Sequence, residues 1–328
     1  MTILHVGKPI SLPDLVPMRN LLSDYDPSGW NRLDLGIDSS GDPQGIDNRY
    51  RAPHTLVSGS TGSSKTITLQ MLAAQALTRG HEVVYINVAG HLDFAGFQPW
   101  MKHVAEGSPE DVVINAAELI ERVYTELRRR FRALAQNMCG FWMDLPDDVR
   151  RREQIRPLTV IVDEFDLLSD KQPVSGALPS EEVERIEGIA TAKAKLVEYA
   201  GQIARSGRAA GVHLVIGTQR VGLEYLNGSL RSNLTARILT VPPTTPPTGI
   251  VQRLMFDASA GEAELLIDTL RSGHPGLAIV QQKTGCEPHG VRVGYAHWED
   301  IAAILEELNV PRANPGFPEY TPMRDEDD

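Results

Sequence analysis

A phosphate loop near residue 60 restricts the fold of this chain more than any other part of its sequence. Residues 59–66 read Gly-Ser-Thr-Gly-Ser-Ser-Lys-Thr, directly after the expected strand His-Thr-Leu-Val-Ser at 54–58 and before a helical run at 67–77. A strand, a glycine-bearing loop and a helix in this order offer backbone N–H groups, a lysine and a hydroxyl to a triphosphate and its Mg²⁺. The sequence therefore predicts a site for ATP and Mg²⁺, whose nucleotide-binding residues are Gly59, Ser60, Thr61, Gly62, Ser63, Ser64, Lys65 and Thr66.

One position of the loop departs from the usual pattern. Ser64 stands where such loops carry glycine before the lysine. In a permissive backbone conformation the serine costs little, whereas a left-handed conformation would cost about 1 kcal/mol or more. A serine-glycine turn that binds nothing is the alternative, and the strand–loop–helix context favours the phosphate loop.

A second motif carries two acids. The apolar run at 158–162 ends in Asp163 and Glu164, which is typical of a buried parallel strand that delivers carboxylates to the carboxyl edge of a sheet. We expect Asp163 to bind Mg²⁺ together with Thr66, and Glu164 to orient or deprotonate the attacking water. A strand end with a purely structural Asp-Glu pair is the alternative. The phosphate loop upstream favours ATP hydrolysis.

A third block places polar residues at both ends of one strand. Thr218 and Gln219 follow the apolar run 213–217 and should emerge at the same edge as Asp163, to sense the γ-phosphate or simply to cap the strand. Arg208 precedes that strand, so it should lie at the opposite edge from its own loop. In a ring it could reach a neighbour's nucleotide as an arginine finger, and the residues alone leave that role open.

The alternation of strands and helices predicts an α/β fold with a mostly parallel sheet. The expected strands are 55–58, 82–87, 158–163, 213–218, 236–241 and 277–281, and the clearest helices are 116–138 and about 181–206, the latter capped by Ser180. Five arginines oppose the apolar stripe of the first helix, and a solvated face is favoured over a nucleic-acid contact: Arg122, Arg128, Arg129, Arg130 and Arg132.

Composition excludes several classes of protein. The chain is 41% hydrophobic with a net charge of −11, which is typical of a globular protein and argues against a surface coated with basic residues. Two distant cysteines exclude a disulfide framework, and no segment has the length and apolarity of a membrane helix. We expect a cytoplasmic protein with a leader and β-hairpin at 1–50, a main domain at 51–310 and a Pro-rich, acidic, flexible tail at 311–328.

Three segments resemble the motor domain of the FtsK/SpoIIIE family of DNA-translocating ATPases, within the FtsK and HerA group. They are residues 53–62, the Val-Ile-Val-Asp-Glu-Phe strand at 160–165 and, most specifically, Gly-Arg-Ala-Ala-Gly-Val-His-Leu-Val-Ile-Gly-Thr-Gln-Arg at 207–220. The resemblance extends roughly from residue 33 to residue 280. It implies a RecA-like P-loop ATPase core, a hexameric ring and double-stranded DNA drawn through the central pore.

The same resemblance implies roles for single residues. Lys65 and Thr66 match the nucleotide and Mg²⁺ contacts, Asp163 and Glu164 the metal-binding and catalytic acids, Gln219 the sensor and Arg208 the finger acting in trans. The chain departs from the family at 87–90, which lacks an acid and a lysine, and at 241–248, which lacks a basic residue. Communication between subunits through that last loop is thus not expected to follow the family pattern.

Two other functions stay open at the level of sequence. A ring ATPase of the type VII secretion kind, acting on protein substrates, is favoured by the acidic balance of the chain. A slow, nucleotide-binding assembly protein is favoured by Ser64 and Asn87.

Because the membrane anchor, long linker and winged helix of full-length translocases are not seen, the motor hypothesis suggests a compact version from a phage, plasmid or other mobile element, with an unknown recruiting protein.

Overall fold

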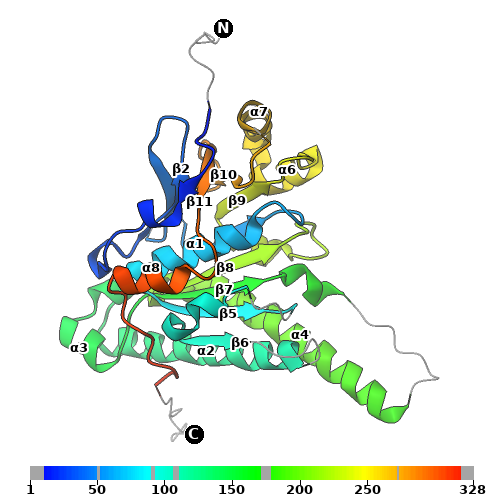
Figure 1. Ribbon diagram of the computed structural model, residues 1–328. Coiled ribbons are helices and arrows are strands. Elements are labelled where there is room, and N and C mark those ends of the chain that lie inside the picture. Colours follow the sequence, from blue (N-terminus) through cyan, green and yellow to red (C-terminus); the bar gives the residue numbers. More distant parts are fainter. Residues whose placement is uncertain are drawn as a thin grey trace, which may run out of the picture.

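One mixed sheet organises the molecule (Figure 1). The computed structural model describes residues 11–49, 52–89, 93–105, 111–170, 179–271 and 273–318. In these ranges the sheet has eleven strands, in the order β3-β2-β11-β10-β9-β4-β8-β7-β5-β6, with β1 beside β11. Residues 1–10 of the expected leader and residues 319–328 of the expected tail lie outside the described ranges.

The parallel half of the sheet holds the sequence motifs. Its strands are β9 (Ala236–Val241), β4 (Thr55–Ser58), β8 (Val212–Thr218), β7 (Leu158–Asp163), β5 (Glu82–Asn87) and β6 (His103–Ala105). Each neighbouring pair in this order is parallel. Since parallel strands end at one edge, β4, β7 and β8 bring the loop, the acids and Gln219 to the same side. The predicted α/β class is confirmed.

The other half of the sheet is antiparallel. It contains β10 (Leu277–Gln281), β11 (His289–Tyr295), β2 (Arg32–Ile37) and β3 (Pro43–Asp47), while β1 (Val16–Pro17) is parallel to β11. The segment 277–281 is a strand as predicted, but it runs antiparallel to both of its neighbours. The hairpin expected near residue 33 is the pair β2 and β3, which continues the sheet through β11 instead of standing apart from it.

Helices cover both faces of the sheet (Figure 1). On one face lie α1 (Lys65–Thr78) and α8 (Ile301–Glu307); on the other lie α2 (Asp111–Gln136), α4 (Ser180–Ser206), α5 (Gly228–Asn233), α6 (Gly249–Phe256) and α7 (Ala260–Leu270). The short α3 (Asp147–Arg152) follows α2, and the 3-10 turns are Met18–Asn20, Pro27–Gly29, Ala95–Trp100, Trp142–Asp144, Phe165–Ser169, Gly207–Ala210 and Asp257–Ser259.

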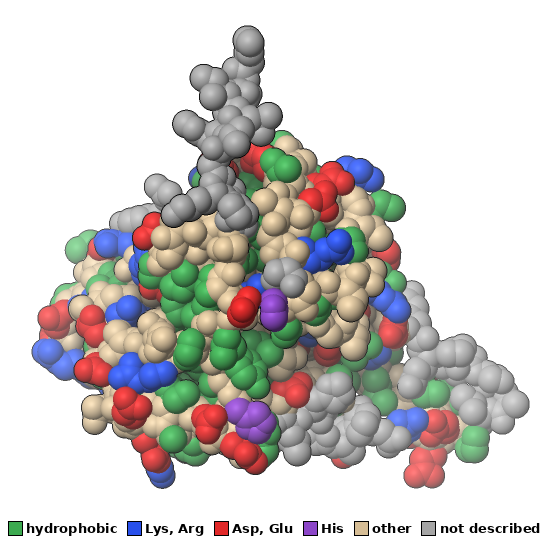
Figure 2. Space-filling view, turned by 45° about the horizontal axis from the view of Figure 1, so that its top comes forward, with side chains coloured by type: hydrophobic (Ala, Val, Ile, Leu, Met, Phe, Trp, Pro, Cys, Tyr) green, Lys and Arg blue, Asp and Glu red, His purple; other side chains and the backbone are tan. Residues whose placement is uncertain are grey.

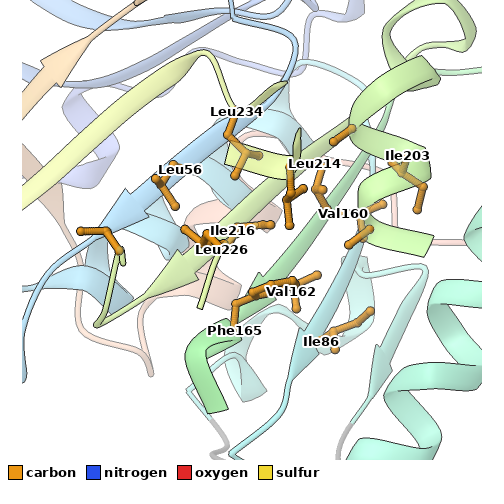
Figure 3. Close-up of a cluster of buried hydrophobic side chains, with 14 of the residues drawn as sticks. Leu56, Ile86, Val160, Val162, Phe165, Ile203, Leu214, Ile216, Leu226 and Leu234 are labelled. Atoms are coloured by element: carbon orange, nitrogen blue, oxygen red, sulfur yellow. The ribbon is translucent and has the colours of Figure 1, made fainter. Parts of the chain in front are cut away.

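Alternation along the buried strands divides the core between the two faces. Leu56 of β4, Leu214 of β8 and Ile203 of α4 belong to one cluster of buried side chains (Figure 3), whereas the adjacent Val57 belongs with Leu69 of α1 to the cluster on the opposite face. Successive side chains of a strand point to opposite faces, so β4, whose four residues are all buried, lies between two helical layers. The loop that follows it therefore starts from a rigid base.

Three local expectations differ from the structure. Ser180 is the first residue of α4 and its side chain makes no cap hydrogen bond, since Pro179 occupies the cap position. Arg129 and Arg130 are buried, so the solvated face expected on α2 is wrong for them. Finally, we expected a flexible tail from residue 311, but the structure places 311–318 against the body, with the Ala313 N–H donating to the Pro99 carbonyl at 3.0 Å.

Three histidines pack together at the amino edge of the sheet. His81 contacts the Thr159 hydroxyl at 2.8 Å and the Trp30 carbonyl at 2.7 Å, and its ring centroid lies 5.7 Å from that of His213. Burial lowers the pKa of His54 to about 3 and that of His81 to about 4, and it lowers the pKa of His213 well below its ordinary value. All three are consequently neutral in the folded protein at neutral pH.

This cluster predicts a loss of stability in mild acid. The unfolded chain protonates each histidine near pH 6.5, so the stabilisation is complete above that pH and is lost as the pH falls toward the folded values. At pH 5 the loss is about 2 kcal/mol for each of His54 and His81, and His213 adds to it in the same direction. We expect the urea midpoint to fall strongly between pH 7 and pH 5. The exposed His297→Gln control should keep that dependence, and an unchanged midpoint at pH 5 would contradict this account.

Candidate nucleotide site

The phosphate loop closes on itself directly after β4. A Cβ added at Gly59 would lie 1.8 Å from Thr240 Oγ1 and 2.3 Å from Ser63 Oγ, so only glycine fits where the backbone passes. The hydroxyls of Ser63 and Thr240 are 2.7 Å apart, and Thr240 Oγ1 donates to the Ser58 carbonyl at 3.1 Å. Gly62 has φ +78, in the left-handed region. These contacts tie the base of the loop to β9.

The loop and the start of α1 fit an anionic ligand. Because α1 begins at Lys65, the N–H groups of its first turn have no carbonyl partner within the helix, and the positive end of the helix dipole faces the loop. Together with the glycine-lined cradle this fits the phosphates of a nucleotide. Thr66 in that first turn and the buried Asp163 are the residues that would hold Mg²⁺.

The backbone conformation of Ser64 shows whether serine is strained at this position of the loop. Ser64 has φ 74 and ψ 24, a left-handed conformation that favours glycine. The loop therefore needs the conformation for which the family pattern has glycine. A serine held there stores about 1 kcal/mol of backbone strain.

Replacing that serine should stabilise the protein. We expect Ser64→Gly to raise the free energy of unfolding by about 0.5–1 kcal/mol, because relief of strain outweighs the added freedom of the unfolded chain. Urea denaturation measures this. The matched Ser63→Gly variant loses the hydroxyl contact with Thr240 and should be less stable than the native chain. A Ser64→Gly protein that is less stable than the native one would show that the serine itself makes a needed contact.

The two acids meet the loop lysine at the carboxyl edge of the sheet. Lys65 Nζ donates to Asp163 Oδ1 and, at 3.0 Å, to Glu164 Oε1, and only 6% of the lysine side chain is exposed. Burial opposes the charge of Lys65, but the two carboxylates outweigh it and raise its pKa. The group is therefore an ammonium ion whose hydrogen bonds the phosphates of a nucleotide would compete for.

Gln219 connects the second acid to the phosphate loop. Its Nε2 donates to both carboxylate oxygens of Glu164, at 3.2 and 3.0 Å, and its Oε1 accepts from Thr61 Oγ1 at 3.3 Å. Glu164 has φ 56, a conformation that is uncommon outside glycine and frequent at functional sites. A change at the phosphates can thus reach the acid through one amide side chain.

Two residues that the sequence analysis missed also shape the site. Asp166 Oδ1 accepts from the Thr218 hydroxyl and from the Gln219 N–H, both at 3.0 Å, so it fixes the strand end that carries Gln219. The position of Asp166 shortly after the Asp-Glu pair is the signal in the sequence that could have identified it. A Cβ added at Gly217 would lie 2.4 Å from Asp163 Oδ1, so glycine there leaves room for the acid.

Arg208 lies apart from this cluster. It sits in the turn Gly207–Ala210, before β8, and its Nε donates to the Arg49 carbonyl at 3.2 Å. β8 then runs seven residues to the site edge, a rise of roughly 20 Å. The structure brings together Thr61, Lys65, Asp163, Glu164 and Gln219. It places Arg208 at the opposite edge, as the sequence predicts.

The fold and the site define a P-loop ATPase with a RecA-like core. The chain belongs to the FtsK/SpoIIIE family, whose sequence profile matches residues 24–223, more than half of its length. Among its relatives, the DNA translocase FtsK of Staphylococcus epidermidis is 28% identical over 239 residues, which cover 68% of this chain and 27% of that protein. The DNA translocase FtsK 2 of Neisseria meningitidis is 26% identical over 284 residues, which cover 84% and 26%. This chain thus spans about a quarter of the length of these curated relatives.

Solved structures share the fold at low sequence identity. The pCW3 conjugation coupling protein TcpA, in a monomer form with ATPγS, superposes with a TM-score of 0.67 at 19% identity, covering 92% of this chain and 76% of that one. The cytoplasmic domain of the type VII secretion ATPase EccC from Thermomonospora curvata has a TM-score of 0.63 at 20% identity, covering 98% and 35%. In the described ranges, no helix has the length and apolarity needed to cross a membrane.

Proposed function

We propose that this protein is an ATP-driven motor that moves double-stranded DNA through a hexameric ring in the cytoplasm. The observation that carries the proposal is the contact of Lys65 with both Asp163 and Glu164, linked through Gln219 to the loop, in a chain of the FtsK/SpoIIIE family. The relatives named DNA translocase supply the expected substrate. The fold shared with a conjugation coupling protein supports an origin in a mobile element.

The chain's own residues suggest how hydrolysis proceeds. When ATP enters the loop, its phosphate oxygens compete with the carboxylates for Lys65, whose ammonium then stabilises charge on the β- and γ-phosphates. Thr66 and Asp163 would hold Mg²⁺, which would supply further positive charge to those phosphates. Glu164, released from Lys65, orients the attacking water and accepts its proton. Through Gln219, the change at the γ-phosphate is transmitted to the end of β8.

Arg208 completes the site of a neighbouring subunit in this proposal. Its position at the edge opposite its own loop suits a ring, in which that edge of one subunit can face the nucleotide of the next. A guanidinium there would stabilise negative charge on the transferring phosphoryl group. The site of an isolated chain is then incomplete.

Loss of the finger should be repaired by mixing. We expect Arg208→Ala to lower turnover roughly 1,000-fold or more, the effect usual for an arginine finger. Lys65→Ala subunits keep their finger, so mixing the two inactive variants should restore activity at about one site in four when assembly is random. Steady-state ATPase measurements on the mixture check this. Two variants that stay inactive together would argue against action in trans.

The DNA contact must be local in a chain of net charge −11. On the face that Figure 2 displays, Lys and Arg side chains are interspersed with Asp and Glu instead of forming one basic surface. Affinity for duplex DNA should accordingly be modest and should fall with salt. We expect duplex DNA to stimulate ATP hydrolysis several-fold at low salt, measured against a matched protein substrate and buffer alone.

Protein transport is the second candidate function. The first turns of α4 expose Glu181, Glu184 and Glu187, a charge that suits a basic protein segment better than the DNA backbone. ATPase activity that ignores duplex DNA but rises with a polypeptide substrate would favour this candidate over the first.

A further inference from the structure

The turn that carries Arg208 is held in place from several sides. A Cβ added at Gly207 would lie 2.5 Å from the Val212 carbonyl oxygen, and one added at Gly211 would lie 2.9 Å from the Trp142 indole. Gly211 is left-handed, with φ +71, and its carbonyl accepts from the Leu158 N–H at 2.8 Å. The base of the Arg208 side chain is thus fixed against two strands and an aromatic ring.

A buried arginine of α2 also binds this turn. Arg130 is fully buried, and its Nη1 donates to the carbonyl of Ala210 at 3.1 Å, with a longer contact to that of Gly211 at 3.4 Å. The same nitrogen donates to the Arg156 carbonyl at 2.7 Å. Carbonyls at the end of a helical turn carry partial negative charge, so a cation there is favourable. The turn Gly207–Ala210, which carries Arg208, is called the finger turn below. One guanidinium therefore joins the end of the finger turn to the segment leading into β7.

The charge of Arg130 is balanced within the fold. Its Nε donates to Glu126 Oε1 at 2.7 Å, and burial of Glu126 is outweighed by Arg130 and Arg129, which lower the pKa of that carboxyl group. Glu82 lies 3.8 Å from Nη2. A buried ion is tolerated only when paired and hydrogen-bonded, and a planar guanidinium fixes several acceptors in one geometry.

We propose that Arg130 is a positioning residue for the Arg208 finger, an inference that rests on the proposed action of Arg208 in trans. Arg130 does not touch nucleotide. It sets the turn from which Arg208 reaches the neighbouring site, so its loss would displace the finger while leaving its own nucleotide site intact. A displacement of about 1 Å in such a group lowers turnover by up to roughly 100-fold.

The same helix provides a matched control. Arg129 is also buried and also bound to Glu126, but its guanidinium donates to Glu126, to the Glu153 carboxylate and to the Glu153 carbonyl. Replacing either arginine leaves Glu126 one cationic partner. The two variants therefore remove similar burial and charge, and only one of them removes a contact with the finger turn.

The test compares Arg130→Met and Arg129→Met, with Arg130→Lys as a variant that keeps a cation beside Glu126. We expect Arg130→Met to bind ATP within threefold of the native affinity, while its turnover falls about 10- to 100-fold. Arg130→Lys should be intermediate, and Arg129→Met should keep most of its turnover. Mixing Arg130→Met with Lys65→Ala should restore activity to the level reached by Arg208→Ala with Lys65→Ala.

Each outcome separates the inference from the proposed function. Suppose that Arg208→Ala mixed with Lys65→Ala regains activity and Arg130→Met mixed with Lys65→Ala does not. The action of Arg208 in trans is then supported and the positioning role of Arg130 is wrong. Equal losses in Arg129→Met and Arg130→Met would also overturn it, because a general effect on the fold would explain both. If neither mixture regains activity, the finger in trans is wrong and this inference falls with it.

Discussion

Glu164→Gln should bind ATP with Mg²⁺ as tightly as the native chain and turn it over roughly 100- to 10,000-fold more slowly. The amide keeps the size of the side chain and can still accept from Gln219, but it cannot take a proton from water. It also gives up the ion pair with Lys65, which leaves the ammonium freer to meet the phosphates. Nucleotide binding by calorimetry and single-turnover hydrolysis measure the two effects separately.

The matched control is Glu187→Gln on the exposed face of α4. It changes the net charge by the same amount outside the cluster of Lys65, Asp163, Glu164 and Gln219, so its turnover should equal that of the native chain. Normal turnover in Glu164→Gln would remove this residue from the mechanism. Weak nucleotide binding in that variant would mean that the acid serves the fold of the site more than the reaction.

Lys65→Ala should lose nucleotide binding almost entirely. Hydrogen bonds between an ammonium and charged oxygens contribute about 1.5–3 kcal/mol each, so the loss of two weakens binding by roughly 100-fold or more. The effect is larger here because the variant leaves the carboxylates of Asp163 and Glu164 without their shared cation, facing the triphosphate. Equilibrium titration with a fluorescent ATP analogue measures the affinity.

Lys102 offers a control with the same burial. It is 5% exposed and paired with Glu82 at 2.7 Å, in a part of the fold away from the loop. Lys102→Ala removes a buried ammonium from an ion pair but should bind nucleotide normally once folded. If both variants lose binding to the same degree, the effect belongs to folding and not to the phosphate contact.

Local patterns were enough for the strands around the site. The runs 55–58 and 158–163 are short, contain β-branched residues and are bounded by turn or acidic residues, and both strands have these bounds in the structure. The phosphate loop and the Asp-Glu pair follow from those runs, because parallel strands end at one edge. What the pattern could not give is orientation: 277–281 looks like any buried strand, yet both of its neighbours run the other way.

Long-range contacts explain the other differences. Helical periodicity places Arg129 and Arg130 on the polar side of α2, but the segment around α3 and Ile155 covers that side and supplies carbonyl acceptors. Thr240 supports the loop only because β9 lies beside β4. The strain at Ser64 depends on a dihedral angle that residue identity leaves open.

Calorimetric titration of the Glu164→Gln chain with ATP, in the presence and absence of Mg²⁺, tests the central claim most directly. The account predicts a micromolar dissociation constant, about −8 kcal/mol of binding free energy. Binding should weaken without Mg²⁺ and should be lost in the double variant that carries both Glu164→Gln and Lys65→Ala. No measurable binding at millimolar ATP with Mg²⁺, in a folded protein, would contradict a nucleotide site between the loop and the paired acids.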